Sequence, residues 1–145
     1  MRSVEEQVVA AHRAFYDAVE TADFDLMGSL WADDPGVSCV HPAAHPLYGT
    51  EKVLRSWAVL MAQIDYIQFF LTDIEVTTFP SGEDPRTALV VCTENILSEG
   101  ESTESFTGGS AVCSSVLVRD GAQWKLWSRH ASPVAVLESG DEADT

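Results

Sequence analysis

The sequence predicts an α+β fold in which helices pack on one face of a curved, mainly antiparallel sheet. Two patterns predict it. Apolar residues recur at helical spacing as far as Gln63, and from there to about residue 134 they alternate with polar residues as strands do. A length of 145 residues is typical of one domain. We therefore expect a single domain over residues 1–137 and an acidic, disordered tail over residues 138–145.

Three helices are expected before the sheet, over about residues 4–20, 24–31 and 50–63. Ser3 and Glu6 have the spacing of a capping box, in which each side chain bonds the backbone N–H of the other residue. Asp23 is placed to cap the second helix and Thr50 to cap the third. The first helix carries its apolar stripe on Val8 and later residues, and His12 is expected on the surface.

The strands expected from alternation are a short one at 37–41 and long ones at 66–79, 86–98, 105–119 and 123–134. Asp120 and Gly121 indicate a tight hairpin between the last two strands, because glycine adopts a positive φ at little cost. Gly108 and Gly109 are expected to mark a bulge or a bend that curves the sheet.

Charge and composition exclude several function classes. The chain has 8 Lys and Arg against 23 Asp and Glu, a net charge of −15. Nucleic acid and anionic membrane surfaces are therefore not expected as partners, because both need basic patches. No apolar segment approaches the length of a membrane span. Three cysteines without C-x-x-C spacing favour reduced thiols and a cytoplasmic location.

Four stretches resemble a known family: FYDAVETADFDLMGSLWADDPGVSCVHP, YGTEKVLRSWAVL, VVCTENIL and WKLWSRHASPV. With the predicted order of elements, they are similar to the SnoaL-like domains of the nuclear transport factor 2-like superfamily. The resemblance implies a cone of three helices on a strongly curved sheet, an apolar pocket and a homodimer. It implies no single activity, because relatives include isomerases, cyclases, dehydratases, hydrolases and association modules.

Glu94 is the first candidate for chemistry. Within residues 88–96 every second residue is apolar except Glu94, so alternation places its carboxylate on a buried face. A buried carboxyl can serve as a general acid or base near neutral pH. The alternative is a structural ion pair with an arginine such as Arg55 or Arg129.

His130 is the second candidate. Alternation along the last strand places it on the same face as Trp124 and Leu126. We therefore predict that His130 and Glu94 point into one cavity and act as the catalytic acid–base pair. A core histidine bonded to the backbone is the alternative.

The loop at residues 41–46 contains two prolines and is expected at the mouth of the cone. His41 is interpreted as a polar group of the pocket and His45 as solvated. No metal is expected, because the prolines prevent the helix that would bring these histidines together. The sequence also lacks nucleotide-binding and serine-hydrolase motifs, so no cofactor is expected.

Aromatic and apolar residues from several elements are expected to line a pocket, with core packing as the alternative. The predicted ligand-binding residues are Tyr16, Trp31, His41, Trp57, Phe69, Val90, Cys92 and Trp124. Without an arginine cluster to guide an anion, the expected ligand is a neutral or weakly polar, ring-sized molecule.

Trp127 lies on the strand face opposite Trp124, so a homodimer through the outer sheet face around Trp127 is expected. The function predicted from these features is a cofactor-free acid–base enzyme, namely an isomerase, cyclase or hydrolase, acting on a small apolar ligand. The alternative is a non-catalytic ligand-binding or homo-oligomeric association module.

Overall fold

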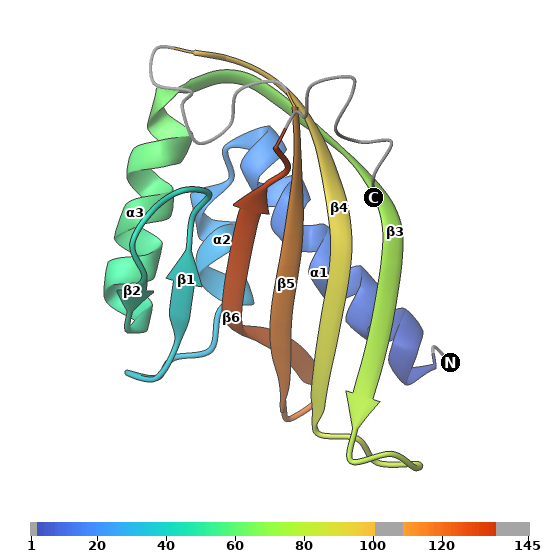
Figure 1. Ribbon diagram of the computed structural model, residues 1–145. Coiled ribbons are helices and arrows are strands. Elements are labelled where there is room, and N and C mark those ends of the chain that lie inside the picture. Colours follow the sequence, from blue (N-terminus) through green and yellow to red (C-terminus); the bar gives the residue numbers. More distant parts are fainter. Residues whose placement is uncertain (1–2, 101–108, 136–145) are drawn as a thin grey trace.

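Three helices lie on one face of a six-stranded sheet in the computed structural model, which describes residues 3–100 and 109–135 (Figure 1). The elements are α1 (Val4–Thr21), α2 (Phe24–Leu30), β1 (Ser38–Val40), β2 (Leu47–Tyr48), α3 (Thr50–Gln63), β3 (Ile64–Phe79), β4 (Thr87–Gly100), β5 (Gly109–Asp120) and β6 (Gln123–Pro133). The predicted α+β class is confirmed. The expected tail at 138–145 and the start of the strand predicted at 105–119 lie outside the described residues.

Local capping explains where α1 and α2 begin. Ser3 Oγ accepts a hydrogen bond from Glu6 N at 3.1 Å, and Glu6 Oε1 accepts one from Ser3 N at 2.9 Å, so the predicted capping box is present. Asp23 Oδ1 accepts a hydrogen bond from Leu26 N at 3.0 Å and caps α2 as predicted. Both helices are fixed by neighbours in the sequence.

Thr50 does not cap α3, contrary to the prediction. The N-cap is Gly49, with φ +89°, and its position has no side-chain capping bond. Thr50 Oγ1 instead donates to Ala32 O at 2.6 Å and accepts from Asp34 N at 2.9 Å. The hydroxyl ties the start of α3 to the segment after α2, because those backbone groups need partners once that segment packs against the helix.

The sheet has the strand order β2-β1-β6-β5-β4-β3. Among the strand pairs of the described residues, β1–β6 is parallel and the others are antiparallel. The two-residue strand β2 was not predicted. The hairpin between β5 and β6 is confirmed, with Gly121 at φ +63°.

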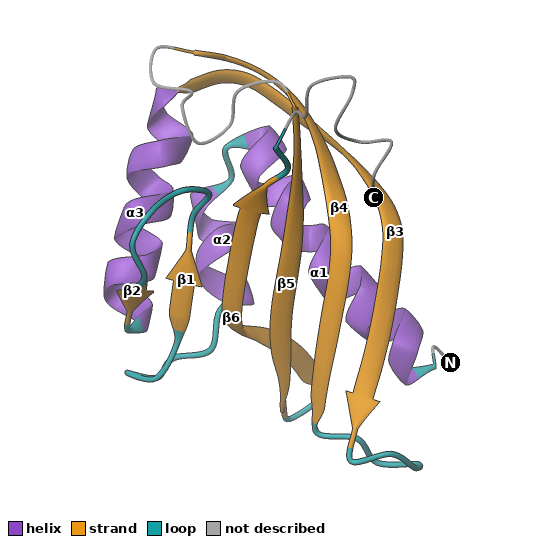
Figure 2. Ribbon diagram, viewed as in Figure 1, coloured by secondary structure: helices purple, strands orange, loops and turns teal. Residues whose placement is uncertain are grey.

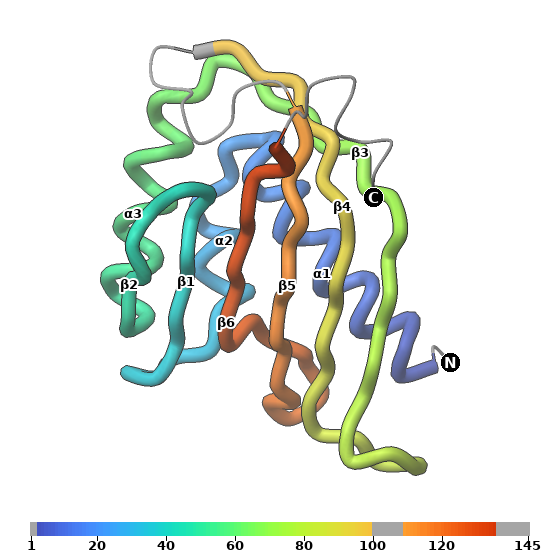
Figure 3. Tube along the Cα trace, in the orientation of Figure 1, coloured from blue at the N-terminus to red at the C-terminus, as the bar shows by residue number. Residues whose placement is uncertain are grey.

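The helices cover the concave face of the sheet, and the other face carries none of the described helices (Figure 2). The tube in Figure 3 shows β3 running from the end of α3 over the top of the sheet and down its edge. A register shift between Thr72 and Glu75 of β3, with Asp73 at φ +54°, marks a bend in this strand. The curved sheet and the helices enclose the hydrophobic core.

A second irregularity changes which residues of β6 face the core. In the β5–β6 pair, Val116 is opposite Ser128, but Leu117 is opposite Leu126, so Trp127 is an extra residue in β6. An extra residue reverses the alternation beyond it. Residues Trp124 and Leu126 before the bulge are buried, and so is Arg129 after it.

Candidate functional site

A cluster of six polar and sulfur-containing side chains lies inside the fold, between α1 and the concave face of the sheet. Its members are His12, Tyr16, Cys92, Glu94, Cys113 and Arg129. Each of them is at most 2% exposed. Helical spacing places His12 and Tyr16 one turn apart on α1, and Cys92 and Glu94 are alternate residues on β4.

Glu94 is the centre of this cluster. Its Oε2 accepts hydrogen bonds from Tyr16 Oη at 2.5 Å and from Arg129 Nη1 at 2.8 Å. Its other oxygen, Oε1, is buried and accepts no hydrogen bond from the part of the chain that the structure describes. Tyr16 Oη also lies 3.4 Å from His12 Nε2, so a chain of polar contacts runs from His12 through Tyr16 to Glu94.

Arg129 holds the cluster together. Its Nη1 also donates to Cys113 Sγ at 2.7 Å. The guanidinium carbon lies 4.5 Å from the ring centroid of Phe15 and 5.8 Å from that of Trp57. These cation–π contacts and the ion pair with Glu94 compensate for part of the cost of burying the charge.

The pKa values follow from burial and from the Arg129 charge. Burial raises the pKa of Glu94, but the Arg129 charge and the hydrogen bonds from Arg129 and Tyr16 outweigh it, and the net pKa lies below the usual 4.5. Burial raises the pKa of Tyr16 well above 10, against the effect of Arg129. Burial, followed by the Arg129 charge, lowers the pKa of His12 to about 4. At neutral pH the carboxylate and guanidinium are charged, whereas the phenol and imidazole are neutral.

His130 does not join this cluster, so the prediction that it shares a cavity with Glu94 is wrong. The bulge at Trp127 turns His130 to the outer face, where it is exposed, and puts Arg129 inward. The sequence suggests Arg129 only in the alternative interpretation, as the partner of Glu94 in a structural ion pair. That ion pair is the contact found in the structure. Unbroken alternation could not reveal the change of face, because the extra residue depends on pairing with β5.

His12 is also placed differently from the sequence interpretation. It is 2% exposed instead of lying on the surface. A signal was available, since position 12 is four residues after Val8 and three before Phe15, the spacing of one helix face. The polar side chain obscured that spacing.

His41 is 7% exposed and lies between the core and a surface groove. Its ring meets Trp57 edge to face at a centroid distance of 4.7 Å, and its Nε2 lies 2.9 Å from Ser56 Oγ. Burial, followed by the Arg129 charge, lowers the pKa of His41 to about 4, so the ring is neutral. His45 is exposed, as expected.

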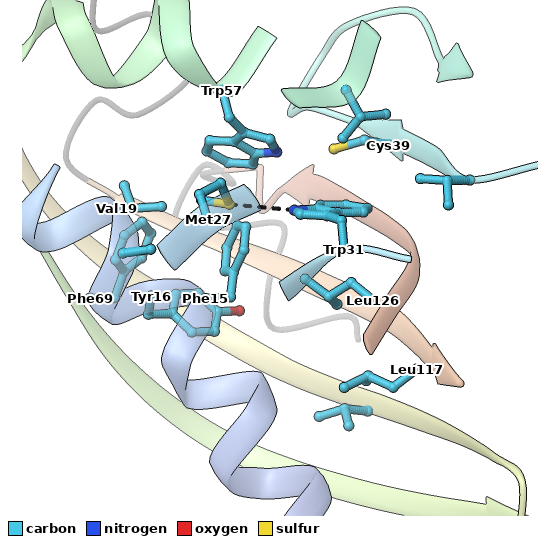
Figure 4. Close-up of a cluster of buried hydrophobic side chains, with 14 of the residues drawn as sticks. Phe15, Tyr16, Val19, Met27, Trp31, Cys39, Trp57, Phe69, Leu117 and Leu126 are labelled. Carbon is cyan, nitrogen blue, oxygen red and sulfur yellow. Dashed lines mark hydrogen bonds between the residues drawn. The ribbon is translucent and has the colours of Figure 1, made fainter. Parts of the chain in front are cut away.

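The other predicted ligand-binding residues are buried in the main hydrophobic core, as Figure 4 shows for several of them, except Cys92, which is buried in a smaller cluster with Cys113 and Ala131. Trp31 Nε1 donates to Met27 Sδ at 3.4 Å, and the ring of Tyr16 contacts that of Phe69 at a centroid distance of 4.9 Å. Trp124 lines a second surface pocket of about 350 Å³ beside the start of β6. That a ligand contacts any of these residues stays a prediction.

Trp127 has a neighbour within its own chain. It is half-buried, and a Cβ built on Gly36 would stand 2.8 Å from Trp127 Cζ2. The loop before β1 thus covers part of the indole. The homodimer expected around Trp127 stays a prediction.

The sequence matches the family model of the SnoaL-like domain over residues 8–136, which is most of the chain. The chain belongs to the SnoaL-like domain family. A candidate dehydratase of the nuclear transport factor 2-like family from Streptomyces avermitilis is 49% identical to this SnoaL-like chain, with a TM-score of 0.79, over 90% of this chain and 96% of the other. The fold implied by the resemblance is confirmed.

Two further solved structures are similar to this SnoaL-like chain. A candidate association domain of a calcium/calmodulin-dependent protein kinase type II from Thiobacillus denitrificans is 26% identical, with a TM-score of 0.65, over 93% of this chain and 98% of the other. A candidate scytalone dehydratase from Novosphingobium aromaticivorans is 10% identical, with a TM-score of 0.70, over 90% and 84%. The last likeness shows the fold alone. No curated protein is significantly similar to the chain.

The side chains of this SnoaL-like domain offer proton chemistry. Within residues 3–100 and 109–135, no three His, Cys, Asp or Glu side chains cluster so that they could hold a metal ion. None of the helices in this described part is both long and apolar enough to span a membrane. The cluster combines a proton acceptor, the Glu94 carboxylate, with a proton donor, the Tyr16 hydroxyl that is hydrogen-bonded to it. Such a set can move protons to and from a bound molecule.

Proposed function

We propose that this SnoaL-like protein is a cofactor-free acid–base enzyme that removes water from a small, mostly apolar molecule. The observation that carries the proposal is the contact chain His12–Tyr16–Glu94 inside the fold. The 49% identity to a candidate dehydratase favours dehydration over the isomerase, cyclase and hydrolase activities considered from the sequence. We also propose that residues 1–137 work as one domain.

The proposed reaction is a β-elimination from a β-hydroxy carbonyl compound. The Glu94 carboxylate takes the proton from the carbon next to the carbonyl group. The electron pair of that C–H bond forms the new C=C bond as the C–O bond breaks. The Tyr16 hydroxyl gives its proton to the departing oxygen, which leaves as water, and the proton held by Glu94 returns to Tyr16 through their hydrogen bond.

The Arg129 charge has a positioning role in this scheme. It keeps Glu94 ionised, so the carboxylate can accept a proton, and it makes charging of His12 unfavourable. Phe15 and Trp57 cover the guanidinium in this structure. Turnover therefore requires side chains around the cluster to move when the substrate enters.

The experiment uses 4-hydroxy-4-phenylbutan-2-one, whose dehydration yields a conjugated ketone that is followed by ultraviolet absorbance. We expect Tyr16→Phe and Glu94→Gln each to lower kcat by about a hundredfold or more while the thermal unfolding curve stays cooperative. The matched control is His130→Asn at an exposed position of β6. Wild-type turnover by folded Tyr16→Phe and Glu94→Gln variants would reject the acid–base roles. Binding without turnover in the wild type would favour the non-catalytic alternative.

A second proposal concerns self-association through the outer sheet face. Phe70, Leu97 and Val112 are 49%, 54% and 42% exposed there, on a face that the described helices leave open. Large exposed apolar patches favour a protein partner. The 26% identity to a candidate association domain supports the same inference.

Because all three cysteines are free and buried, we expect the protein to work in the reducing cytoplasm.

A further inference from the structure

A surface groove of about 500 Å³ runs between α3 and the loop that follows β1. Its volume is in the range of small-molecule sites. Its apolar lining residues are Ala44, Leu47, Val59 and Leu60, and its polar ones are His41, Lys52, Arg55 and Ser56. The groove is separate from the buried cluster, which contributes none of these residues.

Two of the polar groups are already paired with each other. Ser56 Oγ donates its proton to Val53 O at 2.7 Å, so it accepts the hydrogen bond from His41 Nε2 at 2.9 Å. His41 is neutral, with its pKa lowered to about 4 by burial and by Arg129, and its Nδ1 is buried away from the surface. The polar groups left to meet a ligand are therefore the cations Lys52 and Arg55.

Lys52 is unusual among the cations of this chain. Seven of the eight Lys and Arg residues lie in the described part, which leaves out Arg2. Among those seven, Lys52 alone has no described carboxylate within 4.0 Å. The chain has 23 acidic residues, so an ammonium group left without one beside an apolar surface stands out. Arg55, one turn away, pairs with the exposed Glu51 at 3.3 Å.

We propose that this groove binds an apolar small molecule that carries one carboxylate. The carboxylate pairs with Lys52, and the apolar part of the molecule covers Leu47, Val59 and Leu60. Burial of apolar area provides most of the affinity, and the ion pair fixes the orientation. This ligand class differs from the neutral ligand expected from the sequence, because only the fold brings Lys52 and Arg55 to an apolar groove. The proposal does not depend on the dehydratase proposal.

The charge count favours a monoanion. One unpaired ammonium matches one negative charge, whereas a nucleotide or another multiply charged anion would meet no further free cation among the lining residues. The net charge of −15 slows the approach of an anion but does not remove the local preference at the groove. Binding should weaken as salt is added, because this pair lies at the surface.

The test is a titration of the full chain with 2-naphthoate, followed by ¹H–¹⁵N NMR, with 2-naphthamide as the neutral molecule of the same shape. We expect saturable shifts at residues of α3 and a Kd for naphthoate about fivefold lower than for naphthamide. Lys52→Met keeps the apolar stem and should weaken naphthoate about fivefold without changing naphthamide. The control Lys125→Met, at a lysine that lies 3.9 Å from Asp120, should have no effect.

A second variant locates the site. Val59 is 53% exposed, so Val59→Asp should fold normally and abolish naphthoate binding by placing a negative charge in the groove. Any of four results would overturn the proposal. The protein binds naphthoate and naphthamide with equal affinity, Lys52→Met binds naphthoate as tightly as wild type, Val59→Asp binds it unchanged, or the titration gives no saturable shift. Naphthoate should bind Tyr16→Phe as tightly as wild type, so the groove and the dehydratase proposal can fail separately.

Discussion

Arg129 Nη1 lies 2.8 Å from Glu94 Oε2, and the two side chains are 2% and 0% exposed. The contact joins two strands that are separated by β5 in the sheet. It exists because the extra residue Trp127 in β6 turns Arg129 toward the core. This bulge therefore places the Arg129 charge beside Glu94, the only fully buried carboxylate among the described residues.

Removal of one partner of this pair should be costly. Glu94→Gln leaves the Arg129 charge buried without a counter-charge, and we expect the free energy of unfolding to fall by about 3–5 kcal/mol. Urea denaturation followed by circular dichroism measures it. Glu94→Leu combined with Arg129→Met should recover most of the loss. The control Glu51→Gln breaks an exposed pair and should change little. Wild-type stability of Glu94→Gln would contradict the role assigned to the pair.

Acid should weaken the fold through two groups of side chains, first the buried histidines and then Glu94. The pKa of His12 and of His41 is lowered from 6.5 to about 4, chiefly by burial, so between these pH values the unfolded chain binds protons that the folded chain does not. Stability is therefore full above pH 6.5 and falls as the pH drops toward 4, by up to about 1.4 kcal/mol per pH unit for each histidine. The Glu94 contribution is lost only below its usual pKa of 4.5, because its folded pKa is lower still.

Histidine variants test that assignment. Urea titrations at several pH values give the slope of the unfolding free energy against pH. We expect His12→Gln and His41→Asn each to lower this slope by the amount that corresponds to one bound proton. This holds whether or not the variant changes the stability at neutral pH. His45→Asn, at an exposed position of the loop after β1, is the matched control. Parallel pH profiles for all three variants and the wild type would argue against burial of neutral histidines.

Gly36 should be intolerant of a side chain. A Cβ there would lie 2.8 Å from Trp127 Cζ2, so Gly36→Ala must displace the indole, and we expect a loss of about 1–2 kcal/mol in thermal or urea unfolding. Adding Trp127→Leu to Gly36→Ala should recover the lost stability, because it removes the indole that the new Cβ would meet. At Gly28 in α2 a Cβ meets nothing within 4 Å, so Gly28→Ala should stabilise the protein by about 0.5–1 kcal/mol. An unchanged free energy of unfolding in Gly36→Ala would show that Trp127 does not cover this site.

A homodimer through the outer sheet face should depend on Val112. We expect wild-type protein to sediment as a dimer at micromolar concentration and Val112→Lys, near the start of β5, to sediment as a monomer. Val59→Lys introduces the same charge at an exposed valine on α3 and should leave the dimer intact. A monomeric wild type, or a dimer that persists in Val112→Lys, would exclude this interface.

The class of fold and most of its elements follow from local patterns along the chain. The Ser3–Glu6 capping box and the Asp23 cap were predicted because each depends on residues three positions apart. The burial of Glu94 was predicted because alternation is fixed by the pleat of one strand. These are local properties, and the chain carries them whatever it packs against.

The remaining features depend on strand pairing and on packing between distant segments. The partner of Glu94 is Arg129, and His130 lies outside, because a bulge is set by how β6 pairs with β5 and leaves no mark in the alternation of β6. Thr50 bonds the segment after α2 instead of capping α3, because that segment lies against the helix only in the folded chain. Lys52 meets an apolar groove for the same reason, since the loop that forms the opposite wall folds back onto α3. Side-chain neighbours that are far apart in the sequence depend on strand pairing and packing, and local patterns do not encode either of them.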